Sequence, residues 1–288
     1  MADVIIEAKD VAVGYKTHTV MEKVSFSIKE GELVGIVGCN GAGKSTLLKS
    51  LRGILPLQKG EVSFFGVPLQ QYRDKEIAQK IAYLQQHVEV GFGFTAEDIV
   101  MAGRYPYLNW LQHEDNGDRE IVRDCMLCTG TWELRDKPIN NVSGGQKQRV
   151  LLAKVLAQQT PILFLDEPTT GLDLVYQEEI FTFAKDLSRM GKTILMVVHE
   201  LDLAYKYCSK ILLLGQGTLL ADATPQQVFQ DELLSKAYGA EIHIIHNEAT
   251  GNIEVETRSR KKLAEEKKAL LSKLCGQSGR DAEVKDHD

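Results

Sequence analysis

The stretch "GCNGAGKST", residues 38–46, combines residue types that bind phosphate. Its three glycines let backbone N–H groups approach an anion, Lys44 adds positive charge, and Ser45 offers a hydroxyl to Mg²⁺. A helix that begins near Thr46 would point the positive end of its dipole at the same anion. The alternative is a tight glycine turn between a strand and a helix. The spacing favours a phosphate-binding loop that consists of Gly38, Cys39, Asn40, Gly41, Ala42, Gly43, Lys44, Ser45 and Thr46.

An acidic pair ends the apolar stretch "PILFLDE", residues 161–167. A buried strand that delivers carboxylates at its carboxyl end does so where an open parallel sheet binds ligand. Asp166 is suited to the Mg²⁺ shell, and Glu167 is suited to polarise a water that attacks a γ-phosphate. Such a pair is common by chance, but its combination with a phosphate loop indicates nucleotide hydrolysis.

The stretch "NVSGGQKQR", residues 141–149, predicts a second helix start that could bind an anion. Ser143 stands at the cap position, and the glycines behind it leave backbone N–H groups uncovered. The stretch could also be only an N-cap with a flexible approach. Because one nucleotide already has its phosphate loop, a second phosphate-binding helix end suggests a site that is shared with a second molecule.

Composition limits the class of protein. The chain has 288 residues, 43% of them hydrophobic, and can bury a full core. Its net charge of −6 argues against a general nucleic-acid binder. Five scattered cysteines and the absence of a secretory leader predict a reducing, cytosolic compartment. Cys125 and Cys128 fall in a helix-like run and are expected to pack rather than bind metal, whereas Cys39 could be chemically accessible.

Hydrophobic periodicity predicts the order of the elements. The first thirty residues alternate as antiparallel strands, with Ser25 and Ser27 on one face and Phe26 and Ile28 on the other. A helix should follow the phosphate loop, then a strand pair over residues 60–69 and a mainly helical stretch over 73–158. Buried strands at 161–167 and 193–199, joined by a helix over 174–191, predict a parallel sheet. The order predicts an α/β core that carries a helical insertion.

The end of the chain differs in character from this core. Residues 241–255 alternate around Gly251 and suggest a hairpin, and residues 259–274 read as a highly charged helix before a polar end. No apolar run reaches the roughly 18–20 residues that a membrane helix needs, so any work at a membrane would need another subunit.

These motifs, in this order, resemble those of the ATP-binding subunits of ABC transporters, and the resemblance extends from Val4 to about Tyr238. It implies a P-loop ABC-type ATPase core over residues 1–240, with an N-terminal antiparallel β subdomain and a helical subdomain inserted at about residues 87–160. Residues 241–288 would form a C-terminal extension. The resemblance also implies the family's other motifs. The signature would consist of Ser143, Gly144, Gly145 and Gln146, and the D-loop would end in Asp173. His199 would be the switch histidine, Gln86 the glutamine that contacts Mg²⁺ and water, and Tyr15 the aromatic residue that stacks on adenine. Gln85 is the alternative to Gln86.

The resemblance further implies a mechanism and a set of partners. Two subunits, expected as a homodimer, would face each other so that the Ser143 end of one completes the ATP site of the other. Glu167 would polarise water, while Lys44, Gln86, His199 and Mg²⁺ stabilise the transferring phosphoryl group. The expected partners are transmembrane permease subunits and a substrate-binding protein, with no nucleic acid. The subunit would then sit peripherally on the cytoplasmic face of the inner membrane.

The segment "MAGRYPYL", residues 101–108, bears on the cargo and is expected to face the membrane partner. It resembles a "GR-x-P" segment of importer ATPases for iron chelates, haem and cobalamin. Zinc and manganese importer ATPases carry similar segments, and Arg104 to Pro106 could simply be a helix-ending turn.

Other classes of P-loop protein fit less well. A GTPase would need an N-K-x-D run, which this sequence lacks, and the single set of motifs without long heptads argues against translation-factor and chromosome-type relatives. A non-catalytic P-loop binding module is the remaining alternative. It would not need Glu167 and His199.

Overall fold

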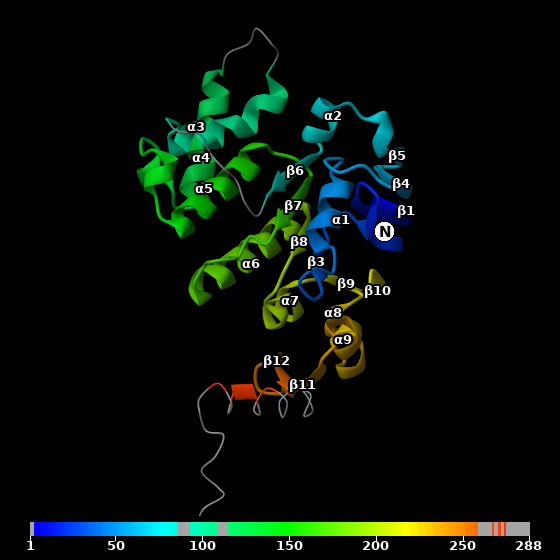
Figure 1. Cartoon of the computed structure of the whole chain (residues 1–288). Helices are drawn as coiled ribbons and strands as arrows, with labels where there is room; N and C mark the ends of the chain where they lie inside the picture. The colour runs from blue at the N-terminus through cyan, green and yellow to red at the C-terminus, as the bar shows by residue number, and fades with distance from the viewer. Residues whose placement is uncertain are drawn as a thin grey trace, which may run out of the picture.

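The computed structural model describes residues 3–85, 91, 93–108 and 114–258, together with Lys267, Leu270, Leu271 and Leu274. Two sheets, a helical layer and a C-terminal hairpin make up this part of the chain (Figure 1). None of the helices within these residues is long and apolar enough to cross a membrane.

The first sheet is antiparallel and contains the N-terminus. Its strands are β1 (Val4–Tyr15), β2 (His18–Lys29), β4 (Lys59–Phe64) and β5 (Val67–Pro68), in the order β2-β1-β4-β5. In β2, Phe26 and Ile28 are buried while Ser25 is exposed and Ser27 half-buried, which confirms the expected alternation. This sheet packs over helix α1 (Lys44–Leu51) in one hydrophobic cluster.

The second sheet holds the strands that lead to the candidate site. It contains β3 (Leu33–Val37), β6 (Ile81–Leu84), β7 (Ile162–Asp166), β8 (Thr193–Val197), β9 (Lys210–Gly215) and β10 (Thr218–Ala223), in the order β10-β9-β3-β8-β7-β6. All neighbouring pairs are parallel except β9 and β10. Every residue of β3, β7 and β8 is buried, because both faces of this sheet are covered.

Strand β6 corrects the sequence interpretation, which assigned residues 73–158 mainly to helices. The short apolar run "IAYL" fits a strand and a buried helix turn equally well. In the structure this run is a strand, because it pairs in parallel with β7, from Ile81 opposite Ile162 to Leu84 opposite Leu165.

Helices cover the second sheet and form the layer to its side. They are α2 (Asp74–Ala78), α3 (Ala96–Met101), α4 (Asn116–Cys128), α5 (Gly144–Ala157), α6 (Leu174–Arg189), α7 (Leu201–Tyr207), α8 (Pro225–Val228) and α9 (Asp231–Tyr238), with short 3-10 turns η1 (Leu69–Gln71), η2 (Ala102–Tyr107), η3 (Trp132–Leu134) and η4 (Ile139–Asn141). Helices α3, α4 and α5 share a cluster of their own, which includes Val100, Val122 and Val150. The helical layer therefore has its own core beside the sheet (Figure 1).

The C-terminal hairpin consists of β11 (Glu241–Asn247) and β12 (Asn252–Arg258). Its turn contains Gly251 with φ 68°. Ile242 of β11 and Ile253 of β12 are buried in the same hydrophobic cluster as Phe229 and Leu234. The hairpin is thus packed against the rest of the fold.

Candidate functional site

The phosphate loop connects β3 to α1, and two of its glycines are required by their surroundings. Gly38 and Gly43 have φ values of 153° and 95°. A Cβ at Gly38 would lie 2.3 Å from the Leu214 carbonyl oxygen, and one at Gly43 would lie 2.7 Å from the Met21 sulfur. Only glycine fits at either position, so the loop can bring its backbone close to a ligand.

Lys44, the first residue of α1, folds back across this loop. Its ammonium donates hydrogen bonds to the carbonyl oxygens of Gly38 (2.6 Å) and Cys39 (3.1 Å), and the side chain is buried. Burial lowers the pKa of Lys44, while the negative charges of Glu167 and Asp166 act in the opposite direction. A buried ammonium among backbone carbonyls is well placed to exchange those contacts for phosphate oxygens.

Asp166 ends β7 and directs its carboxylate at the start of α1. The Ser45 hydroxyl donates to Oδ1 at 2.7 Å, and the Tyr83 hydroxyl donates to Oδ2 at 2.9 Å. Burial raises the pKa of Asp166, although both hydrogen bonds act to lower it. The sequence interpretation missed Tyr83, because its position beside Asp166 depends on the pairing of β6 with β7.

The converging oxygens of Ser45 and Asp166 fit a hard cation. Mg²⁺ prefers oxygen ligands and is typically held by one or two protein groups together with waters and substrate phosphates. Within the described part of the chain, no group of three or more His, Cys, Asp or Glu side chains could hold a metal by itself. The donor set therefore suits a cation that arrives with a phosphate ligand.

Glu167 follows Asp166 but turns its side chain toward a different partner. Its Oε1 lies 2.9 Å from His199 Nε2, and its Oε2 accepts a hydrogen bond from the Thr170 hydroxyl at 3.0 Å. Burial acts to raise the pKa of Glu167, but the hydrogen bonds from His199 and Thr170 and the nearby Lys44 charge act to lower it, and the net shift is downward. Glu167 has φ 52°, a backbone conformation that costs about 1–3 kcal/mol for such a residue and is often kept at functional sites.

A cleft of about 250 Å³ lies between the phosphate loop and Glu167. Its lining consists of Val20, Asn40, Gly41, Gly43, Lys44, Ser45, Thr46 and Glu167. The structure thus brings together most of the predicted phosphate loop and one of the two acidic residues in a single cavity. Tyr15 is exposed at the end of β1 and does not line this cleft. Gln86 lies outside the described residues.

The predicted signature forms a separate, exposed helix end. The Ser143 hydroxyl caps α5 by accepting from the Gln146 N–H at 3.3 Å, and the Gln146 side chain accepts from the Ser143 N–H at 3.0 Å. Gly144 has open space where a side chain would stand, and Gly145 faces Leu172. None of residues 143–146 lines the cleft at the phosphate loop.

One hydrogen bond ties this helix end to the segment that follows the acidic strand end. The Gln148 amide donates to the Pro168 carbonyl at 3.0 Å, a link that sequence reasoning did not anticipate. Asp173 caps α6 by accepting from the Tyr176 N–H at 3.1 Å. The α5 start and the segment after Glu167 are therefore mechanically connected.

The segment 101–108 differs from expectation at Arg104. Arg104 is buried, and its guanidinium donates to Asp118 at 2.8 Å and to the Ala157 carbonyl at 2.8 Å. It therefore joins η2 to α4 and α5 and is not available to a partner. Tyr105 is the exposed residue of this segment.

Comparison with known proteins gives the family. Residues 21–170 match the model of the ABC transporter family. The achromobactin transport ATP-binding protein of Dickeya dadantii is 35% identical over 241 residues, which cover 83% of this chain and 90% of that protein. The hemin import ATP-binding protein of Thermobifida fusca is 39% identical over 249 residues, covering 86% and 87% respectively.

Solved structures agree in fold. An inward-facing metal-chelate type ABC transporter gives a TM-score of 0.78 at 21% identity, over 90% of this chain and 99% of that chain. A dimeric bacterial ABC transporter cassette gives a TM-score of 0.69 at 28% identity, over 77% and 99%. These likenesses confirm the predicted P-loop ABC fold, with its antiparallel β subdomain and helical segments. The chain belongs to the ATP-binding subunits of ABC transporters and is an ATPase of that family.

Proposed function

We propose that this ATPase drives the import of an iron chelate, haem or cobalamin through a membrane permease. Two observations support the cargo class: the relatives named for achromobactin and hemin, and the "GRYP" segment at residues 103–106. Residues 1–240 act as the ATPase domain, with the helical subdomain at about 87–160, and residues 241–288 are an extension of it.

The observation that carries the proposed chemistry is the divergence of the two carboxylates at the end of β7. Asp166 meets Ser45 at 2.7 Å, where the pair would hold Mg²⁺ and thereby neutralise phosphate charge. Glu167 instead borders the phosphate cleft beside His199, where it accepts a proton from the attacking water. Lys44 and the N–H groups of the loop bind the β- and γ-phosphates. Gln86 contributes to the Mg²⁺ and water positions, and Tyr15 stacks on adenine.

A second copy of the chain completes the ATP site. Ser143 and its glycines form a helix end whose backbone N–H groups suit phosphate, yet they lie outside the cleft of their own chain. An antiparallel pair would place this end on the γ-phosphate of the opposite subunit, close to Asp173. The dimeric form of the similar bacterial cassette supports this arrangement.

The remaining partners follow from the role as an import motor. Transmembrane permease subunits bind the ATPase at the cytoplasmic face of the membrane, and a substrate-binding protein delivers the cargo from the other side. Tyr105, which is exposed on η2, contributes to the permease contact.

Reconstitution tests this proposal. The subunit is purified with its permease, incorporated into liposomes with the substrate-binding protein, and assayed for ATP-dependent uptake of an iron chelate, haem and cobalamin. Zn²⁺ and Mn²⁺ serve as competing cargoes, and Glu167→Gln serves as the inactive control. Uptake of Zn²⁺ or Mn²⁺ alone would refute the cargo class while leaving the motor role intact. Uptake that persists at the unmodified rate in Glu167→Gln would refute the motor role.

A further inference from the structure

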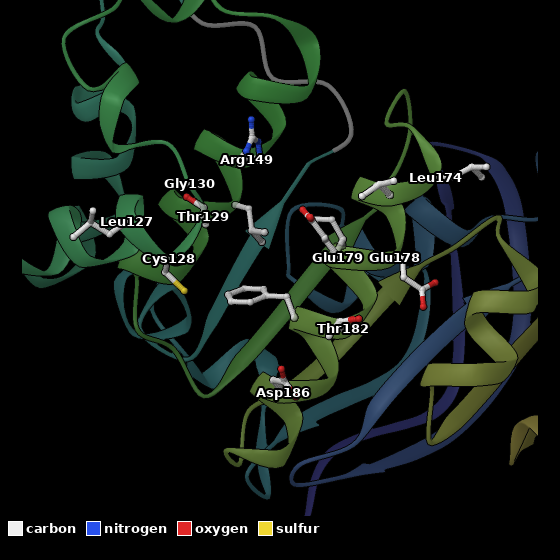
Figure 2. Close-up of a pocket in the computed structure, with 14 residues that line it drawn as sticks. Leu127, Cys128, Thr129, Gly130, Arg149, Leu174, Glu178, Glu179, Thr182 and Asp186 are labelled. Carbon is white, nitrogen blue, oxygen red and sulfur yellow. The ribbon is translucent and has the colours of Figure 1, made fainter.

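An apolar groove lies between the helical layer and α6, away from the phosphate loop (Figure 2). We call it the α5–α6 groove; its volume is about 920 Å³, and its apolar lining includes Leu127, Leu152, Leu174, Val175, Ile180 and Phe183. Leu127, Leu174 and Val175 are 52%, 82% and 67% exposed. Exposed apolar side chains that gather at one groove, with polar residues around them, are typical of an interaction site.

The charges around the groove are mainly negative. Glu178, Glu179 and Asp186 line it from α6, as Figure 2 shows. Glu178 already pairs with Lys206 and Asp186 with Arg189, so Glu179 contributes most of the negative charge that a partner would meet. Arg149 is the one basic side chain among the described residues of the lining. The Arg149 guanidinium is turned over the Tyr176 ring, 4.9 Å from its centroid. The groove thus favours a partner that is apolar on one face and positively charged beside it.

The C-terminal tail of the same chain has these properties. Lys267, Leu270, Leu271 and Leu274 are helical, and the three leucines are between 58% and 82% exposed. Spacings of three and four residues bring Leu274 onto one helix face with Leu271 and Leu270. Residues 259–274 contain six lysines and arginines against two glutamates. The tail therefore carries an uncovered leucine face with basic flanks.

The tail begins within reach of the groove. Strand β12 packs against α7, and α7 packs against α6, which carries Ile180 of the groove. Residues 259–269 separate β12 from the leucines, and eleven residues span up to about 36 Å when extended. A tether this short gives the tail a high effective concentration at the groove.

We propose that the leucine face formed by Leu270, Leu271 and Leu274 docks into the α5–α6 groove of its own chain. A helix held there contacts α4 and α5 on one side and α6 on the other. It joins α5, which Ser143 caps, to α6, which Asp173 caps, and so restrains movement of the helical layer relative to the sheet. Its effect on ATP turnover rests on the proposed function, but the docking itself does not.

Two native cysteines allow a direct test. Cys128 is exposed and lines the groove, and Cys275 directly follows Leu274 in the chain. The full-length protein at low concentration is treated with a short bismaleimide, digested and analysed by mass spectrometry. We expect a linkage between Cys128 and Cys275 within one chain, and its loss in Cys128→Ser and in Cys275→Ser. Failure to form this linkage, or a linkage only between two chains, would overturn docking in cis.

Matched variants test the apolar and charged contacts. Leu270→Asp removes a buried leucine from the docked state and should slow the cross-linking at least about tenfold. Ser272→Asp adds the same charge at a position that falls outside the three- and four-residue spacing of the leucines, and should leave the rate within about twofold. On the groove side, Leu127→Asp should act like Leu270→Asp, whereas Met190→Asp, an exposed position outside the groove, should not. Equal rates in Leu270→Asp and Ser272→Asp would show that the leucine face is not bound. Circular dichroism and ATP affinity confirm that each variant is folded.

Discussion

Replacing Glu167 with glutamine isolates the chemical step from nucleotide binding. In the structure, Oε2 of Glu167 accepts from Thr170 and Oε1 lies 2.9 Å from His199 Nε2. Glutamine keeps the size of the side chain and one acceptor oxygen, so it can still pair with Thr170. It loses the negative charge, and with it the ability to accept a proton from water. The phosphate loop and Lys44 are left unchanged.

The size of the effect follows from the role of a general base. Proton transfer to a positioned base typically contributes 10²- to 10⁴-fold to a rate, so the Glu167→Gln variant should hydrolyse ATP about 10²- to 10⁴-fold more slowly. Its affinity for ATP should stay within a few-fold of the unmodified value. Lys44→Ala provides the contrast, because it removes a charged hydrogen bond that forms already in the bound state. At about 1.5–3 kcal/mol for such a bond, Lys44→Ala should weaken ATP binding roughly 10- to 150-fold.

The assay combines turnover with a measure of subunit proximity. ATP hydrolysis and ATP binding are measured for both variants, each also prepared with Ser143→Cys. In a closed pair, the new thiol should cross-link to the partner subunit's Cys39, which lies in the phosphate loop. We expect ATP to increase this cross-linking strongly in Glu167→Gln and hardly at all in Lys44→Ala. Ser143→Cys alone, without ATP, gives the background.

Two results would refute different parts of the reasoning. If Glu167→Gln hydrolysed ATP near the unmodified rate, Glu167 would not be the base. If the variant trapped ATP but showed no proximity between subunits, the chemistry would stand and the shared site would fall.

Three further predictions concern the surroundings of the site. Arg104→Ala breaks a buried ion pair and should lower the free energy of unfolding, measured by denaturant melts, by about 3–5 kcal/mol. Tyr105→Ala, at an exposed position, should change that free energy by less than about 0.5 kcal/mol but should weaken co-purification with the permease. Asp231 accepts a hydrogen bond from the Ile244 N–H, which lowers the pKa of the carboxyl group from its usual 3.8. The carboxylate therefore stabilises the fold above about pH 4 and loses that contribution as the pH falls through the lowered pKa. The difference in Tm between the unmodified protein and Asp231→Asn should therefore shrink from pH 7 to pH 3; a constant difference would contradict this. Deletion of residues 276–288 should leave ATP turnover nearly unchanged, because it spares the leucines of the tail, and a collapse of activity in a folded variant would assign a role to the polar end.

The parts of the fold that the sequence predicts well are those in which local pattern and tertiary environment agree. The strands that lead to the phosphate loop and to Asp166 are unbroken apolar runs, and both are fully buried in the sheet. The start of α5 at Gly144 follows a serine cap and a glutamine three residues on, a local signal that the structure keeps. Strand β6 has no such signal, since four apolar residues gain a strand only by pairing with β7.

Arg104 shows where a motif resemblance misleads about contacts. The segment at residues 101–108 is expected from sequence to face a partner, and an arginine at such a surface is commonly a contact residue. Its actual partners, Asp118 and the Ala157 carbonyl, are 14 and 53 residues away in the chain. Only the packing of α4 and α5 brings them together. The exposed neighbour Tyr105 is the residue that remains free to contact a partner.

The acidic pair at the end of β7 could be located from sequence, but the different environments of its two members could not. Asp166 is the last residue of β7, whereas Glu167 is the first residue beyond the strand. The left-handed backbone of Glu167, at φ 52°, then turns its carboxylate toward His199. Burial raises the pKa of Asp166, because it disfavours the charged carboxylate, and a bound cation would offset this effect. The pKa of Glu167 is lowered despite its burial, because the side chain accepts hydrogen bonds. Glu167 is therefore ionised at neutral pH with His199 and the Lys44 ammonium near it, as a base for water must be, and the buried Asp166 has an environment that would suit a metal ligand. The proposed function therefore gives two adjacent carboxylates different roles, because the fold gives them different partners.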